Sequence, residues 1–163
     1  MYASPVGSQA SGQVAVVFND ITERKRRDAN AAFLADLSEA LLNVSTPADI
    51  VRVLGERVGS FFGAAGCTFT NINEAKDEAA VSADWHPSDL PSLVGSYRLS
   101  DYVTDELRQT LAADRPTVVR DVRADSRITE QQRLAARRIR SFINVPLVRD
   151  NRWRFVLGVY HDE

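Results

Sequence analysis

Few residues in this sequence belong to the types that most often act as nucleophiles, proton carriers or metal ligands. Cys67 is its single cysteine, and His86 and His161 are its two histidines. The nucleophile-elbow, zinc-protease, phosphate-loop and paired-cysteine motifs do not occur in it. Without a partner at a suitable spacing, each of these three residues is more simply interpreted as a structural or exposed side chain. We therefore expect a chain with no catalytic residues and no metal site.

A group of aromatic and polar residues in the middle of the chain is better suited to binding a small molecule. Aromatic walls with a few polar groups, placed on loops beside a rigid sheet, are typical of ligand pockets. The alternative is that the same aromatic side chains fill the core between a sheet and its helices. The expected pocket residues, which would suit a planar or heterocyclic ligand, are Trp85, Tyr97, Arg98, Asp101, Tyr102, Leu107, Phe142 and Asn144.

The elements that must position these residues follow from the apolar pattern. β-branched and aromatic runs predict strands at 12–19, 67–73, 78–85, 96–99, 117–122, 141–148 and 153–161, after a loose lead-in at 1–11. Helical periodicity predicts helices at 21–44, 47–62, 102–113 and 129–138. Thr46 before Pro47, and Thr129 with Gln132, are helix-start signals. This order predicts an α+β fold, an antiparallel sheet with helices on both faces.

The first long helix carries a narrow apolar stripe of Phe33, Leu37, Leu41 and Val44. Spacings of four, four and three residues place these side chains on one face. The stripe fits either a helix packed on its own domain or the seam of a parallel two-helix dimer. In the next helix, Gly55, Gly59 and Gly63 predict the close approach of another backbone, for which the alanine-rich first helix is the expected partner.

Charge and composition restrict the location and the partners of the chain. The net charge is −2, yet residues 115–154 hold eleven arginines against four acidic residues. This basic segment lacks the interleaved aromatic residues of single-strand binding, so we expect a solvated, salt-bridged face and no nucleic acid. The sequence has no secretory leader and no apolar run of roughly 20 residues, and its lone cysteine fits a reducing compartment. These features predict a cytoplasmic segment without membrane contact.

The stretch from Phe33 to Asp162 resembles a GAF domain. The resemblance rests on AAGCTFTNINE, on LSDYVTDELRQTLAADRPTVVRDV, and on ADSRITEQQRLAARRIRSFINVPLVRDNRWRFVLGVYHDE. The upstream piece VAVVFNDITERKRRD looks like the last strand of a PAS domain and its exit junction. The resemblance implies a PAS-like tail at 1–20, a linker or signalling helix at 21–44 that also packs on the domain, and a GAF domain at 45–163 without its C-terminal helix.

Such an arrangement implies a regulatory sensory domain of a bacterial signalling protein. The expected parent is a sensor histidine kinase of a two-component system, in which a homodimer relays the signal to an output domain in the same polypeptide. The alternatives are a ligand-free structural dimerisation module and the GAF domain of a cyclic-di-GMP enzyme. A methionine sulfoxide reductase is a further alternative, against which the lone strand cysteine argues.

The ligand itself is not identified by the sequence. Chromophore-binding members of the family place their cysteine in the helical middle of the domain, whereas Cys67 falls on the first strand, so no covalent bilin is expected. The signature residues of cyclic-nucleotide members are not found. A small-molecule cofactor or ligand of unknown identity is therefore the expectation.

Overall fold

The computed structural model describes residues 2–5, 14–17, 19–86, 91–135 and 138–162. The chain divides into two compact units, Met1–Glu39 and Ala40–Glu163. In the described part of the chain, no helix combines the length and the apolar character needed to cross a bilayer.

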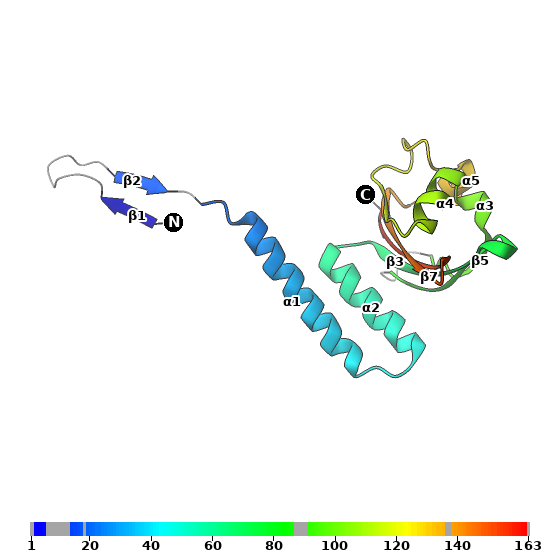
Figure 1. The fold of residues 1–163 in the computed structure, drawn as a ribbon, viewed down its shortest axis with the longest axis horizontal. Helices are drawn as coiled ribbons and strands as arrows, with labels where there is room; N and C mark the ends of the chain where they lie inside the picture. Colours follow the sequence, from blue (N-terminus) through cyan, green and yellow to red (C-terminus); the bar gives the residue numbers. More distant parts are fainter. Residues whose placement is uncertain (1, 6–13, 18, 87–90, 136–137, 163) are drawn as a thin grey trace. The chain divides into compact units, whose positions relative to one another are not determined.

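The first unit contains a hairpin and most of a helix (Figure 1). Strand β1 (Tyr2–Pro5) pairs antiparallel with β2 (Val14–Val17). The expectation of a loose lead-in was therefore wrong for residues 2–5, because this short stretch finds a ladder partner. Helix α1 (Thr22–Leu42) begins where the backbone N–H of Thr22 donates to Asp20 Oδ1 at 2.9 Å. Of the predicted stripe, Phe33, Leu37 and Leu41 lie on α1 and are partly buried, whereas Val44 lies just beyond the helix end.

The second unit is built on six antiparallel strands in the order β5-β4-β3-β8-β7-β6 (Figure 1). The first and the last of these strands along the chain, β3 and β8, are neighbours at its centre, so strands far apart in sequence share one sheet. The strand bounds are β3 (Gly66–Asn73), β4 (Glu78–Trp85), β5 (Gly95–Arg98), β6 (Thr117–Val119), β7 (Ser141–Arg149) and β8 (Arg152–His161). A short 3-10 turn, η1 (Glu74–Lys76), joins the first two.

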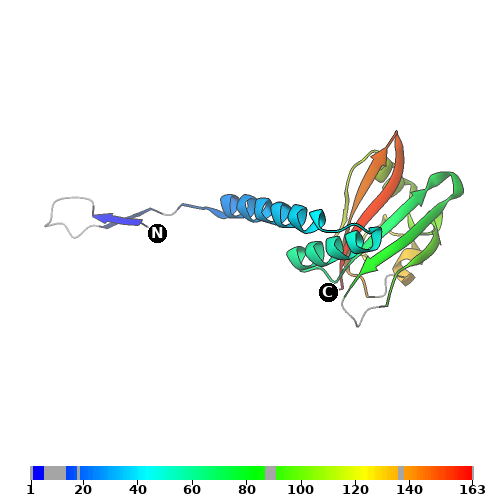
Figure 2. The same cartoon turned by 90° about the horizontal axis from the view of Figure 1, so that it is seen from below.

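Helices cover both faces of this sheet (Figures 1 and 2). Helix α2 (Pro47–Phe62) packs on β3 and β4. It starts at Thr46, whose hydroxyl accepts from the backbone N–H of Asp49 at 3.1 Å, and ends at Gly63, which is left-handed at φ 60°. The opposite face carries α3 (Leu99–Tyr102), α4 (Asp105–Ala112) and α5 (Glu130–Ala135). The predicted α+β architecture is confirmed.

One of the predicted helices is divided into two helices in the structure. The expected helix at 102–113 is split into α3 and α4, because Val103 and Thr104 adopt extended backbone conformations. The Thr104 hydroxyl donates to the carbonyl of Arg127 at 3.0 Å, which helps to fix the break. Half of the predicted Thr129–Gln132 capping box is present: the backbone N–H of Gln132 donates to Thr129 Oγ1 at 3.0 Å, but the side-chain oxygen of Gln132 accepts no hydrogen bond among the described residues.

The core between the sheet and helices α3–α5 consists of two apolar clusters. Leu107 and Leu111 of α4 are buried, and each of them belongs to one of the two clusters. The first cluster is Leu107, Val119, Val122, Ile128, Phe142 and Tyr160, and the second is Ile72, Ala79, Leu99, Leu111, Trp153 and Val156.

Candidate functional site

A pocket of about 200 Å³ lies between the sheet and the helices α3 and α5. Strands β3, β4, β5 and β7 supply one wall, and Tyr102 of α3 and Gln132 of α5 supply the other. Ala79 and Val81, two residues apart on β4, point to this face together, as the pleat requires. The lining residues are Thr68, Ala79, Val81, Leu93, Tyr97, Tyr102, Gln132, Ile139 and Phe142.

A smaller cavity of about 130 Å³ adjoins the pocket and shares five of its residues. It adds the polar groups of Asn144 and Tyr160 and the bare backbone of Gly158. A Cβ at Gly158 would overlap the Thr68 hydroxyl and come within 3.1 Å of Asn144 Oδ1. Glycine at this position therefore lets β8 pass beneath both polar side chains.

The two tyrosines of the pocket are held in a fixed arrangement. The ring centroids of Tyr97 and Tyr102 lie 5.2 Å apart, with the ring planes at 76°. The Tyr97 hydroxyl donates to the carbonyl of Leu93 at 2.8 Å, and burial raises the pKa of this phenol. Edge-to-face rings of this kind form a rigid apolar wall.

Gln132 brings a buried polar atom without a hydrogen-bond partner to the pocket. Its backbone N–H is used by the helix cap, but its side-chain Oε1 is buried and accepts no hydrogen bond among the described residues. A buried acceptor without a donor costs about 1–3 kcal/mol. A bound molecule that donates to this oxygen would recover part of that free energy.

One side of the pocket is fixed by Asp84 at the end of β4. Its carboxylate accepts from the backbone N–H of Leu93 and from the hydroxyl of Ser92, the latter at 3.2 Å. His86 Nε2 lies 3.9 Å from the same carboxylate. Asp84 therefore positions Leu93, and through its carbonyl the Tyr97 hydroxyl.

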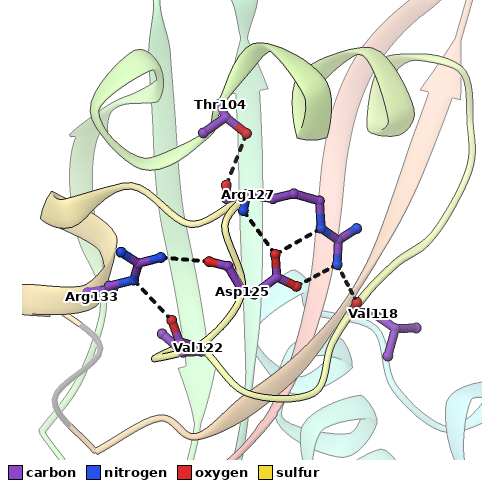
Figure 3. A network of polar contacts seen from close by, with 6 residues as sticks. All are labelled: Thr104, Val118, Val122, Asp125, Arg127 and Arg133. Atoms are coloured by element: carbon purple, nitrogen blue, oxygen red, sulfur yellow. Dashed lines mark hydrogen bonds and ion pairs between the residues drawn. The ribbon is translucent and has the colours of Figure 1, made fainter.

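The segment before α5 is held by two arginines (Figure 3). Arg127 forms a two-pronged pair with Asp125, at 3.0 and 2.7 Å, and donates to the carbonyl of Val118. Arg133 donates to the carbonyls of Val122 and Asp125, at 3.2 and 2.6 Å. The hydrogen bonds from the Arg127 side chain lower the pKa of Asp125. We call the side chains of Asp125, Arg127 and Arg133 the arginine clamp. The clamp ties α5, and with it Gln132, to the rest of the domain.

Four of the eight predicted pocket residues line these cavities. Tyr97, Tyr102 and Phe142 line the larger one, and Asn144 lines the smaller one. The sequence interpretation missed several lining positions, among them Gln132, Thr68 and Leu93. Gln132 was assigned only to a helix cap, and nothing in the sequence indicated that its side chain also enters a cavity.

The other four predicted residues lie elsewhere. Trp85 packs on the opposite face, against Gly55 and Gly59 of α2, so the close neighbour of these two glycines is an aromatic side chain and not the backbone that was expected. The cause is a bulge at Ser82, where the ladder with β3 skips one residue and reverses the alternation of β4.

Arg98, Asp101 and Leu107 are also outside the cavity lining. Arg98 is exposed, with Nε 3.0 Å from Asp77 Oδ2. Asp101 has an exposed side chain, and its carbonyl accepts from the Thr129 hydroxyl at 2.7 Å. Leu107 belongs to a core cluster together with Phe142.

The residues first considered for chemistry are separated from the pocket. Cys67 is completely buried, and burial raises its pKa to about 11. Because Thr68 faces the pocket, its neighbour Cys67 points to the α2 face. His161 lines a hollow of about 390 Å³ on that face, beside exposed apolar residues such as Val118, Ile143 and Val145. Within the described ranges, no three histidine, cysteine or acidic side chains are grouped to hold a metal ion.

Comparison with known proteins identifies the fold. No protein-family model matches the sequence, and no curated protein matches it significantly. A phycoerythrobilin-bound GAF domain from a cyanobacterial phytochrome is 16% identical, with 84% of this chain and 83% of that chain covered and a TM-score of 0.65. Free methionine-R-sulfoxide reductase from Neisseria meningitidis, in complex with its substrate, is 19% identical, with 91% and 81% covered and a TM-score of 0.62.

A third similar structure is the chromophore-binding domain of an unusual bacteriophytochrome from R. palustris. It is 13% identical, with 89% of this chain covered and a TM-score of 0.62. The present chain spans 54% of the length of that one. At these identities the similarity shows the fold alone: the chain has the α+β fold of GAF domains, an antiparallel sheet with helices.

Proposed function

We propose that this chain is a regulatory sensory domain that binds a small molecule between its sheet and helices α3 and α5. The observation that carries the proposal is the pocket itself, about 200 Å³ in volume, walled by Tyr97, Tyr102 and Phe142 and bordered by the buried oxygen of Gln132. Concave apolar sites with few polar groups are where small ligands bind.

The structural neighbours support this use of the fold. One GAF domain was solved with phycoerythrobilin bound, and the reductase was solved with its substrate. A covalent bilin is not part of the proposal, because Cys67 points away from the pocket and burial raises its pKa to about 11.

The signal passes, in this proposal, to an output domain in the same polypeptide, with a histidine kinase as the first candidate. Support comes from the PAS-like junction VAVVFNDITERKRRD and from the apolar stripe Phe33, Leu37 and Leu41 of α1. A homodimer joined along this helix, located in the cytosol, would transmit a change in the populations of two conformations.

The chain itself is proposed to be non-catalytic. A reductase of the methionine sulfoxide type needs a reactive thiolate that faces its substrate. The thiol of Cys67 is fully buried and its pKa is raised, so it is a poor nucleophile near neutral pH. The remaining alternative is a structural dimerisation module whose pocket stays without a ligand.

A thermal-shift screen with a pocket-filling variant tests the proposal. The wild-type chain is heated with a library of neutral and charged metabolites, and the hits are repeated with Val81→Trp, which fills the pocket, and with Val118→Trp, on the exposed face of β6. We expect at least one metabolite to raise the Tm of the wild type and of Val118→Trp but not that of Val81→Trp. Hits that stabilise all three proteins equally would contradict binding in this pocket.

A further inference from the structure

The lining of the two adjoining cavities carries information about the class of ligand. Of the described residues that line them, none is an aspartate, glutamate, lysine, arginine or histidine. The nearby charges are already engaged: Asp84 accepts from Leu93 and Ser92, and Arg98 pairs with Asp77 outside the cavity. A charged group moved from water into this site would lose its hydration without gaining a counter-charge from any described lining residue.

The size of the site suits a ligand of one or two rings. A cavity of 150 Å³ lined by apolar side chains is enough to hold benzene. The larger cavity measures about 200 Å³, and the adjoining one adds about 130 Å³. The edge-to-face pair of Tyr97 and Tyr102, together with Phe142, offers aromatic surfaces for a planar molecule.

The polar group that fixes the orientation of such a molecule is the side-chain oxygen of Gln132. It is buried at the pocket wall and has no donor among the described residues. The Tyr97 hydroxyl, another polar group of the main cavity, already donates to the Leu93 carbonyl. A ligand with one N–H or O–H group would complete the hydrogen bonding of Gln132.

We propose that the pocket selects a neutral, planar, mono- or bicyclic aromatic compound that donates one hydrogen bond to Gln132. This inference rests on the proposed ligand-binding function and adds the chemical class to it. Anionic ligands such as phosphorylated or carboxylated ring compounds are discriminated against, because none of the described lining residues is a cation that could receive them.

Three probes that share a fused two-ring frame test the proposal, with their affinities for the full chain measured by calorimetry. Indole has a donor, benzofuran replaces that donor by an ether oxygen, and indole-3-carboxylate adds an anion. A buried hydrogen bond contributes about 1–1.5 kcal/mol, and about 1.4 kcal/mol corresponds to a tenfold change in the dissociation constant. Indole is therefore expected to bind about five- to tenfold more tightly than benzofuran. The carboxylate is expected to bind at least about tenfold more weakly than indole.

Variants of Gln132 identify the group that makes this distinction. Gln132→Met keeps the length of the side chain and removes the strong acceptor. The affinity for indole should therefore fall to the affinity for benzofuran. Gln132→Leu serves as the second variant if Gln132→Met unfolds. Gln131→Met is the matched control on the same helix, because Gln131 is exposed, and it should leave the indole-to-benzofuran ratio unchanged.

Several outcomes would overturn the assignment. If indole-3-carboxylate binds more tightly than indole, or if Gln132→Met keeps the ratio of the wild type, the ligand class is wrong while ligand binding in the pocket stands. Binding of none of the three probes also refutes the class. In that case the metabolite screen with Val81→Trp decides separately whether the pocket binds any ligand.

Discussion

Gly55 and Gly59 leave space in α2 for the indole ring of Trp85. A Cβ at either position would overlap atoms of that ring, so these glycines are explained by the packing of one helix on β4. Glycine inside a helix costs about 1 kcal/mol relative to alanine. Here the close contact with a large aromatic side chain offsets that cost.

A double-mutant cycle tests this packing. Gly59→Ala should destabilise the wild type by about 1–3 kcal/mol through overpacking. In a Trp85→Ala background the same change should stabilise by about 1 kcal/mol, because only the helix propensity remains. Urea denaturation gives both values, and Ser60→Ala, at an exposed position of α2, is the control. The same sign of effect in both backgrounds would contradict the contact.

The buried thiol of Cys67 links stability to alkaline pH. Burial raises its pKa from 9.0 to about 11 in the folded protein. The unfolded chain therefore loses this proton at lower pH than the folded chain, and the free energy of unfolding falls as pH rises from about 9 to about 11. Tyr160 adds a similar fall at higher pH, since burial raises its pKa to about 12.

The contribution of Cys67 can be separated with one variant. Cys67→Ala should be less stable than the wild type at neutral pH. It should lose less stability between pH 8 and 10.5, because the variant has no thiol to titrate. The fall due to Tyr160 is present in both proteins. Denaturant titrations at several pH values measure the two slopes. Parallel pH profiles would show that the thiol keeps its ordinary pKa in the folded state.

At the scale of elements, the arginine clamp joins the irregular segment between β6 and α5 to the helix that carries Gln132. Three backbone carbonyls, of Val118, Val122 and Asp125, accept hydrogen bonds from Arg127 and Arg133 (Figure 3). Such bonds substitute for regular secondary structure, which this segment lacks. The position of one pocket wall therefore depends on side chains that do not line the pocket.

Loss of the clamp should loosen this wall. Arg133→Met removes two hydrogen bonds to carbonyls, so we expect a loss of about 1–2 kcal/mol in stability. We also expect faster hydrogen exchange at the amides of Ile128 and Gln132, which donate within this segment. Arg123→Met is the control, because no described hydrogen bond or ion pair involves the Arg123 side chain. Unchanged exchange in Arg133→Met would show that α5 is held by other contacts.

The element order was predictable because strands and helices differ in their apolar period. The strands β3, β4, β7 and β8 fall within one or two residues of the expected ranges, and α2 begins at its predicted cap. The pairing of residues 2–5 and the break at Val103–Thr104 depend on contacts with distant residues, which a local pattern does not contain.

The same limit applies to the pocket. Tyr97, Tyr102 and Phe142 were predicted, since aromatic residues near a loop are conspicuous in a sequence. Trp85 was assigned to the pocket, but the bulge at Ser82 turns it to the opposite face. Gln132 was missed because only the packing of α5 on the sheet shows that its side-chain oxygen is buried without a donor.

At the scale of the whole molecule, the proposal of a homodimer rests on the apolar stripe of α1. A charge on that stripe should separate the chains: Leu37→Asp is expected to shift the molar mass measured by light scattering from dimer to monomer. Ala35→Asp introduces the same charge about 200° around the helix and should remain dimeric. A wild-type chain that is monomeric at high concentration would contradict the dimer and the helical relay.

The central claim is that the pocket between the sheet and helices α3 and α5 holds a small molecule. Native mass spectrometry of the chain, purified without denaturation from the cells that express it and then exposed to a metabolite extract, measures this directly. We predict a mass above that of the bare polypeptide, lost on denaturation, present in Val118→Trp and absent in Val81→Trp. A bare mass for the folded wild type, or an added mass that persists in Val81→Trp, would contradict the claim.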